Sequence, residues 1–158
     1  MKRLAAACVL ALASPLQAAD LTVEPARIHA CHAATPEGQR SPVCLGQASD
    51  NCQMLPGGST TQGIAACIAA ETAIWDDILN AEYRTTRTDL KTRDANEGSD
   101  LAGSLQKVQR AWIAFRDAEC DLTYAQWEGG SVRGIAYANC LLVMTAERSI
   151  ALRDMRPR

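Results

Sequence analysis

The cysteines are the residues whose types and spacing most clearly suggest chemistry in this chain. A Cys-x-x-Cys pair, which would suit thiol–disulfide exchange, does not occur in the sequence. An even set of six follows residue 30, and an oxidising compartment would join them into three structural disulfides: Cys31, Cys44, Cys52, Cys67, Cys120 and Cys140. We therefore expect cysteines that stabilise the fold rather than react.

Two histidines, His29 and His32, flank Cys31 and raise the hypothesis of a metal site. Once Cys31 is oxidised, two imidazoles are too few ligands for a typical site. They are also the only histidines able to activate a nucleophile, and the sequence has no Gly-x-Ser-x-Gly elbow. We expect a protein without enzymatic activity, metal or cofactor, and keep metal binding by the histidines as an alternative.

The segment from Gln109 to Cys120 is the richest in charged and aromatic residues. Helical spacing places Trp112, Phe115 and Cys120 on the inward side, with Arg116 one turn after Trp112 at the edge of the core. An inward arginine needs a partner. We predict a structural polar network, with a ligand-binding cluster as the alternative, formed by Asp76, Asp77, Asn80, Tyr83, Arg116, Glu119 and Arg148.

Residues 1–19 have the pattern of a secretory signal peptide: a basic start, an apolar stretch over Leu4–Leu12, and small residues at Ala18 and Ala19. Cys8 lies too near the start of the apolar stretch for a convincing lipid acceptor, although lipidation there stays open. No later stretch approaches about 18 uninterrupted apolar residues, so we expect no transmembrane segment after signal removal. The predicted location is periplasmic or secreted.

Cleavage would leave fourteen basic and eighteen acidic residues, and thus a formal charge of −4. The basic residues form no run of five or more, so binding to nucleic acid through a basic stripe is not expected.

The prolines divide the rest of the chain into a loop-rich segment, 20–58, and a helical domain, 59–156. Apolar residues recur at threes and fours in the second part. They predict helices over roughly 60–92, from Ser99 or Asp100 to about Trp127, and from a cap at Ser131 past Ile150. Short joints favour an all-α antiparallel bundle of about three main helices.

The helix pattern also suggests how the cysteines pair. Cys120 and Cys140 lie at nearly equal distances from the Gly129-Gly130 joint, so an antiparallel hairpin would bring them together. We expect Cys52 to bond Cys67 and hold the preceding loop on the first long helix, which leaves Cys31 with Cys44 in a small N-terminal loop. The bridge between Cys120 and Cys140 would contribute on the order of 3 kcal/mol.

The motifs as a whole resemble a known family. They are Leu79-Asn80-x-x-Tyr83 with Cys67, Gln109-Arg110-Ala111-Trp112-Ile113-x-Phe115-Arg116-Asp117-Ala118-x-Cys120, Gly129-Gly130-Ser131, and Cys140-Leu141-x-x-x-Thr145-x-x-Arg148. Over roughly residues 50–153 the chain is similar to the LprI-type domain of small exported bacterial proteins, named after a mycobacterial lipoprotein described as a lysozyme inhibitor. The Cys31/Cys44 loop lies outside that pattern.

The resemblance implies a helical, disulfide-bonded envelope protein that binds a lysozyme-type muramidase. Such enzymes carry catalytic carboxylates in a long cleft, and a protruding loop with a hydroxyl or a cation could occupy it. We predict a partner-binding site at the joint between the second and third helices, formed by Trp127, Glu128, Ser131 and Arg133. The alternatives are an ordinary helix joint there, and an envelope interaction or stress protein with an unidentified protein partner.

Overall fold

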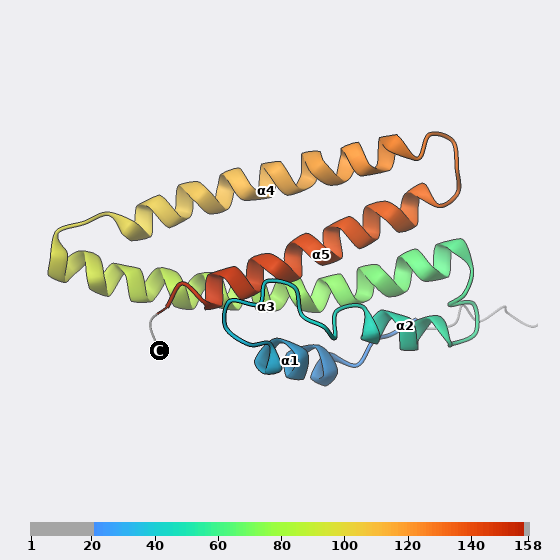
Figure 1. Cartoon of the computed structure of the whole chain (residues 1–158), viewed down its shortest axis with the longest axis horizontal. Coiled ribbons are helices and arrows are strands. Elements are labelled where there is room, and N and C mark those ends of the chain that lie inside the picture. Colours follow the sequence, from blue (N-terminus) through green and yellow to red (C-terminus); the bar gives the residue numbers. More distant parts are fainter. Residues whose placement is uncertain (1–20, 157–158) are drawn as a thin grey trace, which may run out of the picture.

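The computed structural model describes residues 21–156, and this part of the chain is entirely α-helical and loop (Figure 1). The predicted signal peptide, residues 1–19, and Cys8 lie outside the described residues. The described part has five helices: α1 (Pro25–Ala34), α2 (Gln47–Gln53), α3 (Thr61–Glu97), α4 (Leu101–Gln126) and α5 (Arg133–Arg153).

The three long helices form the antiparallel bundle that the sequence predicted. In Figure 1, α4 runs back along α3, and α5 returns between them in the direction of α3. The all-α fold with about three main helices is confirmed. The two short helices were not expected, because prolines are frequent before residue 57. Pro25 is compatible with α1 because it occupies the first helical turn, where a missing N–H costs nothing.

Both ends of α3 are defined by local chemistry. The Thr60 hydroxyl accepts a hydrogen bond from the Gly63 amide at 2.9 Å, one of the caps that the sequence predicted. At its other end α3 continues five residues beyond the expected position, through the predicted turn, and stops where Gly98 adopts a left-handed conformation with φ 68°. Helix α3 therefore extends well past the end of α5 (Figure 1).

The carboxylate of Asp94, in the last turn of α3, joins α3 to α4. It accepts hydrogen bonds from the amides of Leu101 and Ala102 at 2.7 and 2.9 Å and from the Ser99 hydroxyl at 2.6 Å. These bonds favour the charged form and lower the pKa of Asp94, with the Ser99 bond the largest cause. The turn that reverses the chain is thus fixed by a residue of the helix before it.

Two apolar clusters hold the helices together. The larger surrounds the fully buried Trp75 of α3 and joins α1, α2, α3 and α5; its buried members are Ile28, Cys31, Ala48, Ile68, Trp75, Ile78, Ala138, Leu142 and Ala146. The smaller lies where α3, α4 and the end of α5 meet, and contains Leu79, Leu90, Ala102, Leu105 and Leu152. The N-terminal helices therefore share a core with the bundle.

Three disulfides connect these elements, in the pairs expected from the sequence: Cys31–Cys44, Cys52–Cys67 and Cys120–Cys140. Cys67 and Cys120 are completely buried. The first two disulfides attach the segment before α3 to the bundle, and the third joins α4 to α5 across the hairpin.

The inward face of α4 differs from the prediction in one respect. Trp112 and Cys120 face the bundle, but Phe115 is 58% exposed and points away from it. Gln109 is buried instead, because its side-chain oxygen accepts a hydrogen bond from Arg148 of α5 at 2.9 Å. The inward face therefore includes the polar Gln109 in place of Phe115, which hydrophobic spacing alone did not indicate.

Among the described residues one helix, α5, is long and apolar enough by length and composition to cross a membrane. It is also the helix that packs against both α3 and α4 (Figure 1). Buried core helices satisfy the same criterion, so the composition of α5 is a weak indication of a membrane span.

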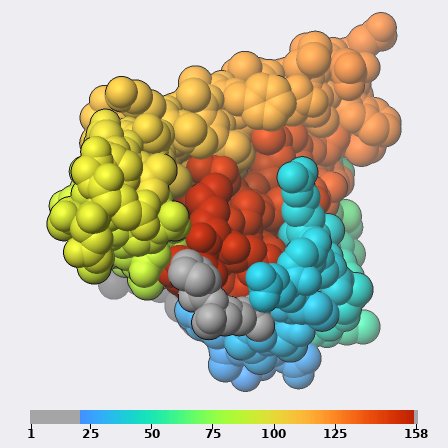
Figure 2. All heavy atoms as spheres, turned by 60° about the vertical axis from the view of Figure 1, so that its left-hand side comes forward, coloured from blue at the N-terminus to red at the C-terminus, as the bar shows by residue number. Residues whose placement is uncertain are grey.

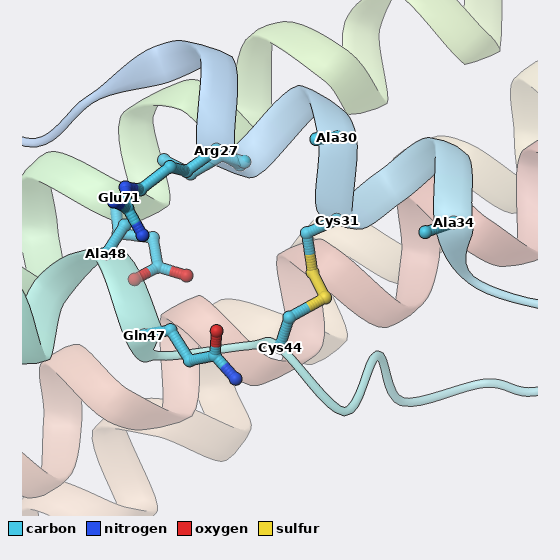
Figure 3. A pocket seen from close by; sticks show the side chains of 9 residues that line it. Arg27, Ala30, Cys31, Ala34, Cys44, Gln47, Ala48 and Glu71 are labelled. Atoms are coloured by element: carbon cyan, nitrogen blue, oxygen red, sulfur yellow. A yellow bond between two sulfur atoms is a disulfide. The ribbon is translucent and has the colours of Figure 1, made fainter.

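A buried carboxylate on α3 holds α2 in place. Glu71, 1% exposed, accepts hydrogen bonds from the amides of Gly46 and Ser49 at 2.9 and 2.7 Å and from the Trp75 indole at 3.2 Å. Figure 3 shows its carboxylate at a pocket between α1 and α2 that the Cys31–Cys44 disulfide also lines. Because Glu71 satisfies amides at the start of α2, this pocket is better explained by structure than by ligand binding.

A second group of polar contacts connects α1 to the end of α5 and to α3. Arg153 donates a hydrogen bond to the His32 carbonyl at 2.7 Å, and the His32 ring lies 3.7 Å from a Glu82 oxygen and edge-on to Trp75. Burial lowers the pKa of His32 below its ordinary value of 6.5, although the Glu82 carboxylate partly offsets this. The folded protein therefore favours the neutral imidazole.

Replacing Glu71 with glutamine should destabilise the protein by about 2 kcal/mol, because an amide group cannot accept all the hydrogen bonds that the carboxylate accepts. Chemical denaturation with disulfides intact would measure the loss. Glu24→Gln is the control, since Glu24 is an exposed carboxylate that pairs with Arg27 on the surface. Equal stability of Glu71→Gln and the parent would refute the role given to Glu71.

Stability should also fall in mild acid through His32. The unfolded chain binds a proton near pH 6.5 and the folded chain binds it less readily, so the contribution is complete above that pH and is lost below it. We expect the free energy of unfolding to fall as the pH drops from about 6.5 through the lower pKa of folded His32, and His32→Gln to reduce that fall. The exposed His29 provides the matched control; an unchanged pH dependence in His32→Gln would contradict the prediction.

Candidate partner-binding site

The joint between α4 and α5 lies at the free end of the hairpin (Figure 1). We call residues 127–132 and the adjoining Arg133 the tip. Residues 127–132 are all exposed, and the two large apolar side chains among them, Trp127 and Val132, are 51% and 45% exposed. The tip therefore combines apolar surface with an accessible backbone.

Arg133 holds the tip together from its position at the start of α5. Its Nη1 donates a hydrogen bond to the Glu128 carbonyl at 3.1 Å, and its guanidinium lies 4.8 Å from the centre of the Tyr124 ring. Tyr124 in turn packs edge to face on Tyr137 of α5. Glu128 has a left-handed backbone with φ 46°, which is uncommon for a residue with a side chain. Arg133 thus fixes the loop around this strained residue.

Ser131 has a different position from the one expected. It was predicted as the N-cap of the last helix, but Val132 occupies that position and makes no side-chain capping bond. The Ser131 side chain is instead exposed in the loop and does not cap the helix. A side chain at Gly129 would meet no neighbouring atom, so the loop is open to solvent at this point.

The predicted polar network is partly assembled between α3 and α4. Arg116 pairs with Asp117 at 2.8 Å and lies 4.0 Å from Asp76, which accepts a hydrogen bond from Asn80 at 3.0 Å. Asp77 and Glu119 were also proposed as partners, but both are exposed and the acids around Arg116 are Asp76 and Asp117. Helical rotation directs those two predicted side chains away from the guanidinium.

Arg148 joins this network without an acidic partner. It donates to Gln109, and its guanidinium lies 5.7 Å from the centre of the Trp112 ring; Arg116 lies 5.2 Å from the same ring. Burial lowers the pKa of Arg148. One indole therefore contacts two cations, and the contact with Arg148 joins α4 to α5 through cation–π attraction.

A cavity of about 340 Å³ adjoins the network, and the residues that line it are Asp76, Leu79, Asn80, Tyr83, Gln106, Gln109, Arg110, Trp112, Ile113 and Arg116. Tyr83, predicted as part of the network, lines this cavity. The arrangement could accept a polar side chain of a partner, which makes the cavity a second candidate site. Two of its charged groups, Asp76 and Arg116, already pair with each other, so the tip is the better candidate.

Sequence reasoning named the tip residues but missed the groups that hold them. The pairing of Tyr124 with Arg133 and Tyr137 required the relative rotation of α4 and α5, which no local pattern encodes. No group of three or more histidine, cysteine, aspartate or glutamate residues suited to a metal occurs within residues 21–156. His32 faces Glu82 and Trp75, and Cys31 is in a disulfide.

The described part of the chain is thus a disulfide-bonded helical bundle with an exposed tip. The sequence matches the family described as lysozyme inhibitor LprI over residues 52–152, and the chain belongs to that family. An uncharacterized protein of Rhizobium meliloti (strain 1021) is 33% identical over 86 residues, which are 51% of this chain and 62% of the relative. The chain thus covers less than two thirds of that relative's length. No solved structure matches this chain.

Replacing Arg116 with alanine should lower the stability of the bundle by about 1 kcal/mol, because it removes the Trp112 contact and the pairing with Asp76 and Asp117. Thermal unfolding of the oxidised protein would measure this. Arg84→Ala is the matched control, since Arg84 also lies on a long helix but is exposed. Equal melting temperatures for the two variants would show that Arg116 does not stabilise the bundle.

Proposed function

We propose that this protein is an exported inhibitor of lysozyme-type muramidases, and that the tip is the part that enters the enzyme. Membership of the LprI lysozyme inhibitor family supports the activity. The observation that carries the choice of site is the exposed tip at the end of a hairpin held by the Cys120–Cys140 disulfide. The three disulfides are consistent with an oxidising location such as the periplasm or the exterior.

The tip has the chemistry that a carboxylate-bearing cleft would recognise. Muramidases of this type use a pair of carboxylic side chains that flank the scissile bond. The exposed Ser131 hydroxyl is a hydrogen-bond donor that a carboxylate could accept from, whereas the nearby Gly130 amide already donates to the Trp127 carbonyl within the loop. Trp127 would anchor the tip on an apolar subsite, as large aromatic side chains often do in protein interfaces.

Arg133 has a positioning role in this proposal. The sequence suggested that its cation would reach the enzyme's carboxylates, whereas the guanidinium is engaged by the Glu128 carbonyl and the Tyr124 ring. A loop that is ordered before binding loses less conformational entropy on association. Arg133 would therefore increase affinity by keeping Trp127 and Ser131 in place.

The net charge favours encounter with a basic enzyme. The mature chain would carry a formal charge of −4, and opposite net charges increase association rates at low ionic strength. Added salt should therefore slow association more than it affects dissociation.

A second candidate function is that of an envelope interaction or stress protein with a different protein partner. The cavity between α3 and α4 supports this alternative, because Arg116 and Trp112 beside it could receive a side chain. Under this alternative, changes at the cavity would alter binding while changes at the tip would not.

The direct test is the lysis of cell-wall suspensions by an animal-type lysozyme, titrated with the oxidised protein from residue 20 onward. We expect stoichiometric inhibition by the parent protein. The double variant Trp127→Ala/Ser131→Ala should weaken inhibition at least about tenfold, because it removes the apolar anchor and the hydroxyl together. Both side chains are exposed, so the variant should retain the parent's melting temperature.

The matched control is Val43→Ala/Ser41→Ala, which removes an exposed apolar side chain and an exposed hydroxyl far from the tip in sequence. It should inhibit like the parent. Loss of inhibition in both double variants would argue against the tip as the site. A parent protein that neither binds nor inhibits the enzyme at micromolar concentrations would exclude animal-type lysozyme as the partner.

A further inference from the structure

The outer face of α4 carries an apolar stripe that nothing in the described part of the chain covers. Six residues at alternating spacings of three and four define it, and all are exposed: Val108, Ala111, Phe115, Ala118, Leu122 and Ala125. Phe115 is 58%, Leu122 54% and Val108 50% exposed. Figure 2 shows α4, yellow to orange, along the upper edge of the molecule with α5, in red, below it. We call these six residues the outer stripe.

Its spacing is that of a two-helix interface. Residues that alternate at three and four positions lie on one side of a helix and form the seam of a coiled coil. The stripe extends over 18 residues, or about 27 Å of helix. A monomer has no use for such a regular seam on its solvent side, because the residues that pack α4 on the bundle, such as Leu105 and Cys120, lie on another face.

The order of large and small residues selects the occupant. Val108, Phe115 and Leu122 alternate with three alanines. An antiparallel copy of α4 would place Val108 opposite Ala125, Ala111 opposite Leu122, and Phe115 opposite Ala118, so that each large residue meets a small one. A parallel copy in register would instead place Phe115 against Phe115 and alanine against alanine, which leaves alternating clashes and gaps.

The charges beside the stripe select the same arrangement. On one flank, the basic residues Lys107 and Arg110 lie in the first half of the helix, and the acidic residue Asp121 lies in the second half. In antiparallel pairs the same flank of each helix faces its counterpart. Arg110 of one copy would then lie within a turn of Asp121 of the other, with unlike charges opposed.

From this self-complementarity we propose that the protein forms a two-fold symmetric dimer through antiparallel pairing of α4 along the outer stripe. A two-fold axis near residues 116 and 117 would relate the copies, so each contact occurs twice. A single helix face of this length makes a small interface, so the dissociation constant of the dimer should be micromolar rather than nanomolar. The inference is independent of the proposed function.

Sedimentation velocity of the oxidised protein from residue 20 onward, from low micromolar to about 0.5 mM, tests the proposal. We expect a monomer–dimer equilibrium. Phe115→Glu should shift it to monomer by at least about tenfold, because a charge would be buried in the seam. Val43→Glu is the control, since Val43 is 86% exposed but far from the stripe in sequence, and it should dimerise like the parent. Circular dichroism would establish that both variants are folded.

A charge exchange tests the orientation. Arg110→Glu should weaken the dimer because the new glutamate of one copy would face Asp121 of the other. The double variant Arg110→Glu/Asp121→Arg should restore the dimer, because unlike charges would again face each other at both contacts. A parent that stays monomeric at all concentrations, or a dimer that Phe115→Glu leaves intact, would overturn the proposal. Lost lysozyme binding in Phe115→Glu with a monomeric parent would likewise overturn it and assign the stripe to the enzyme.

Discussion

The Cys120–Cys140 disulfide is the constraint on which the geometry of the hairpin depends. The second half of α4 is almost entirely exposed, and Cys120 is its one fully buried residue. Beyond it lie six more residues of helix and then the tip. Apolar packing alone offers little to keep this part of α4 on α5, so the covalent bond performs that task. Its position near the end of the hairpin limits the motion of the tip, and the Arg133 contacts with Glu128 and Tyr124 order the loop itself. A small protein can therefore present a defined loop without a large core beneath it.

Carboxylates on α3 perform a related task at the other joints. Glu71 accepts hydrogen bonds from amides at the start of α2, and Asp94 accepts hydrogen bonds from amides at the start of α4. In both places a side chain from the long helix satisfies the N–H groups that a helix start leaves without partners. α3 is thus the element to which the others are attached: α2 through Glu71 and Cys67, α4 through Asp94, and α5 through the buried Thr86 hydroxyl, which donates to the Leu152 carbonyl at 2.8 Å.

Much of this architecture could be predicted from the sequence, because it depends on spacing along the chain. Helical periodicity gave the three long helices, and the position of the glycine joint relative to Cys120 and Cys140 indicated their pairing. The features that sequence reasoning missed depend on contacts between distant segments. α1 and α2 are short and contain or adjoin prolines, and their stability comes from packing on α3 and from Glu71. Phe115 was assigned to the wrong face because Gln109 is turned inward and bonds Arg148 of α5, a contact that hydrophobic spacing alone cannot reveal. Arg133 was expected to reach the partner's carboxylates, but its guanidinium is engaged by the Glu128 carbonyl and the Tyr124 ring, contacts that spacing along the chain does not indicate.

The central claim is that a disulfide-held hairpin presents the tip to a muramidase. Hydrogen–deuterium exchange of the oxidised protein, with and without an excess of animal-type lysozyme, tests it most directly because it reports every backbone amide at once. The account predicts slower exchange in the enzyme's presence for residues 127–134, with the N-terminal helices and the α3–α4 cavity unchanged. Protection confined to the cavity around Asn80 and Gln109, or to α1 and α2, with the tip unaffected, would contradict it.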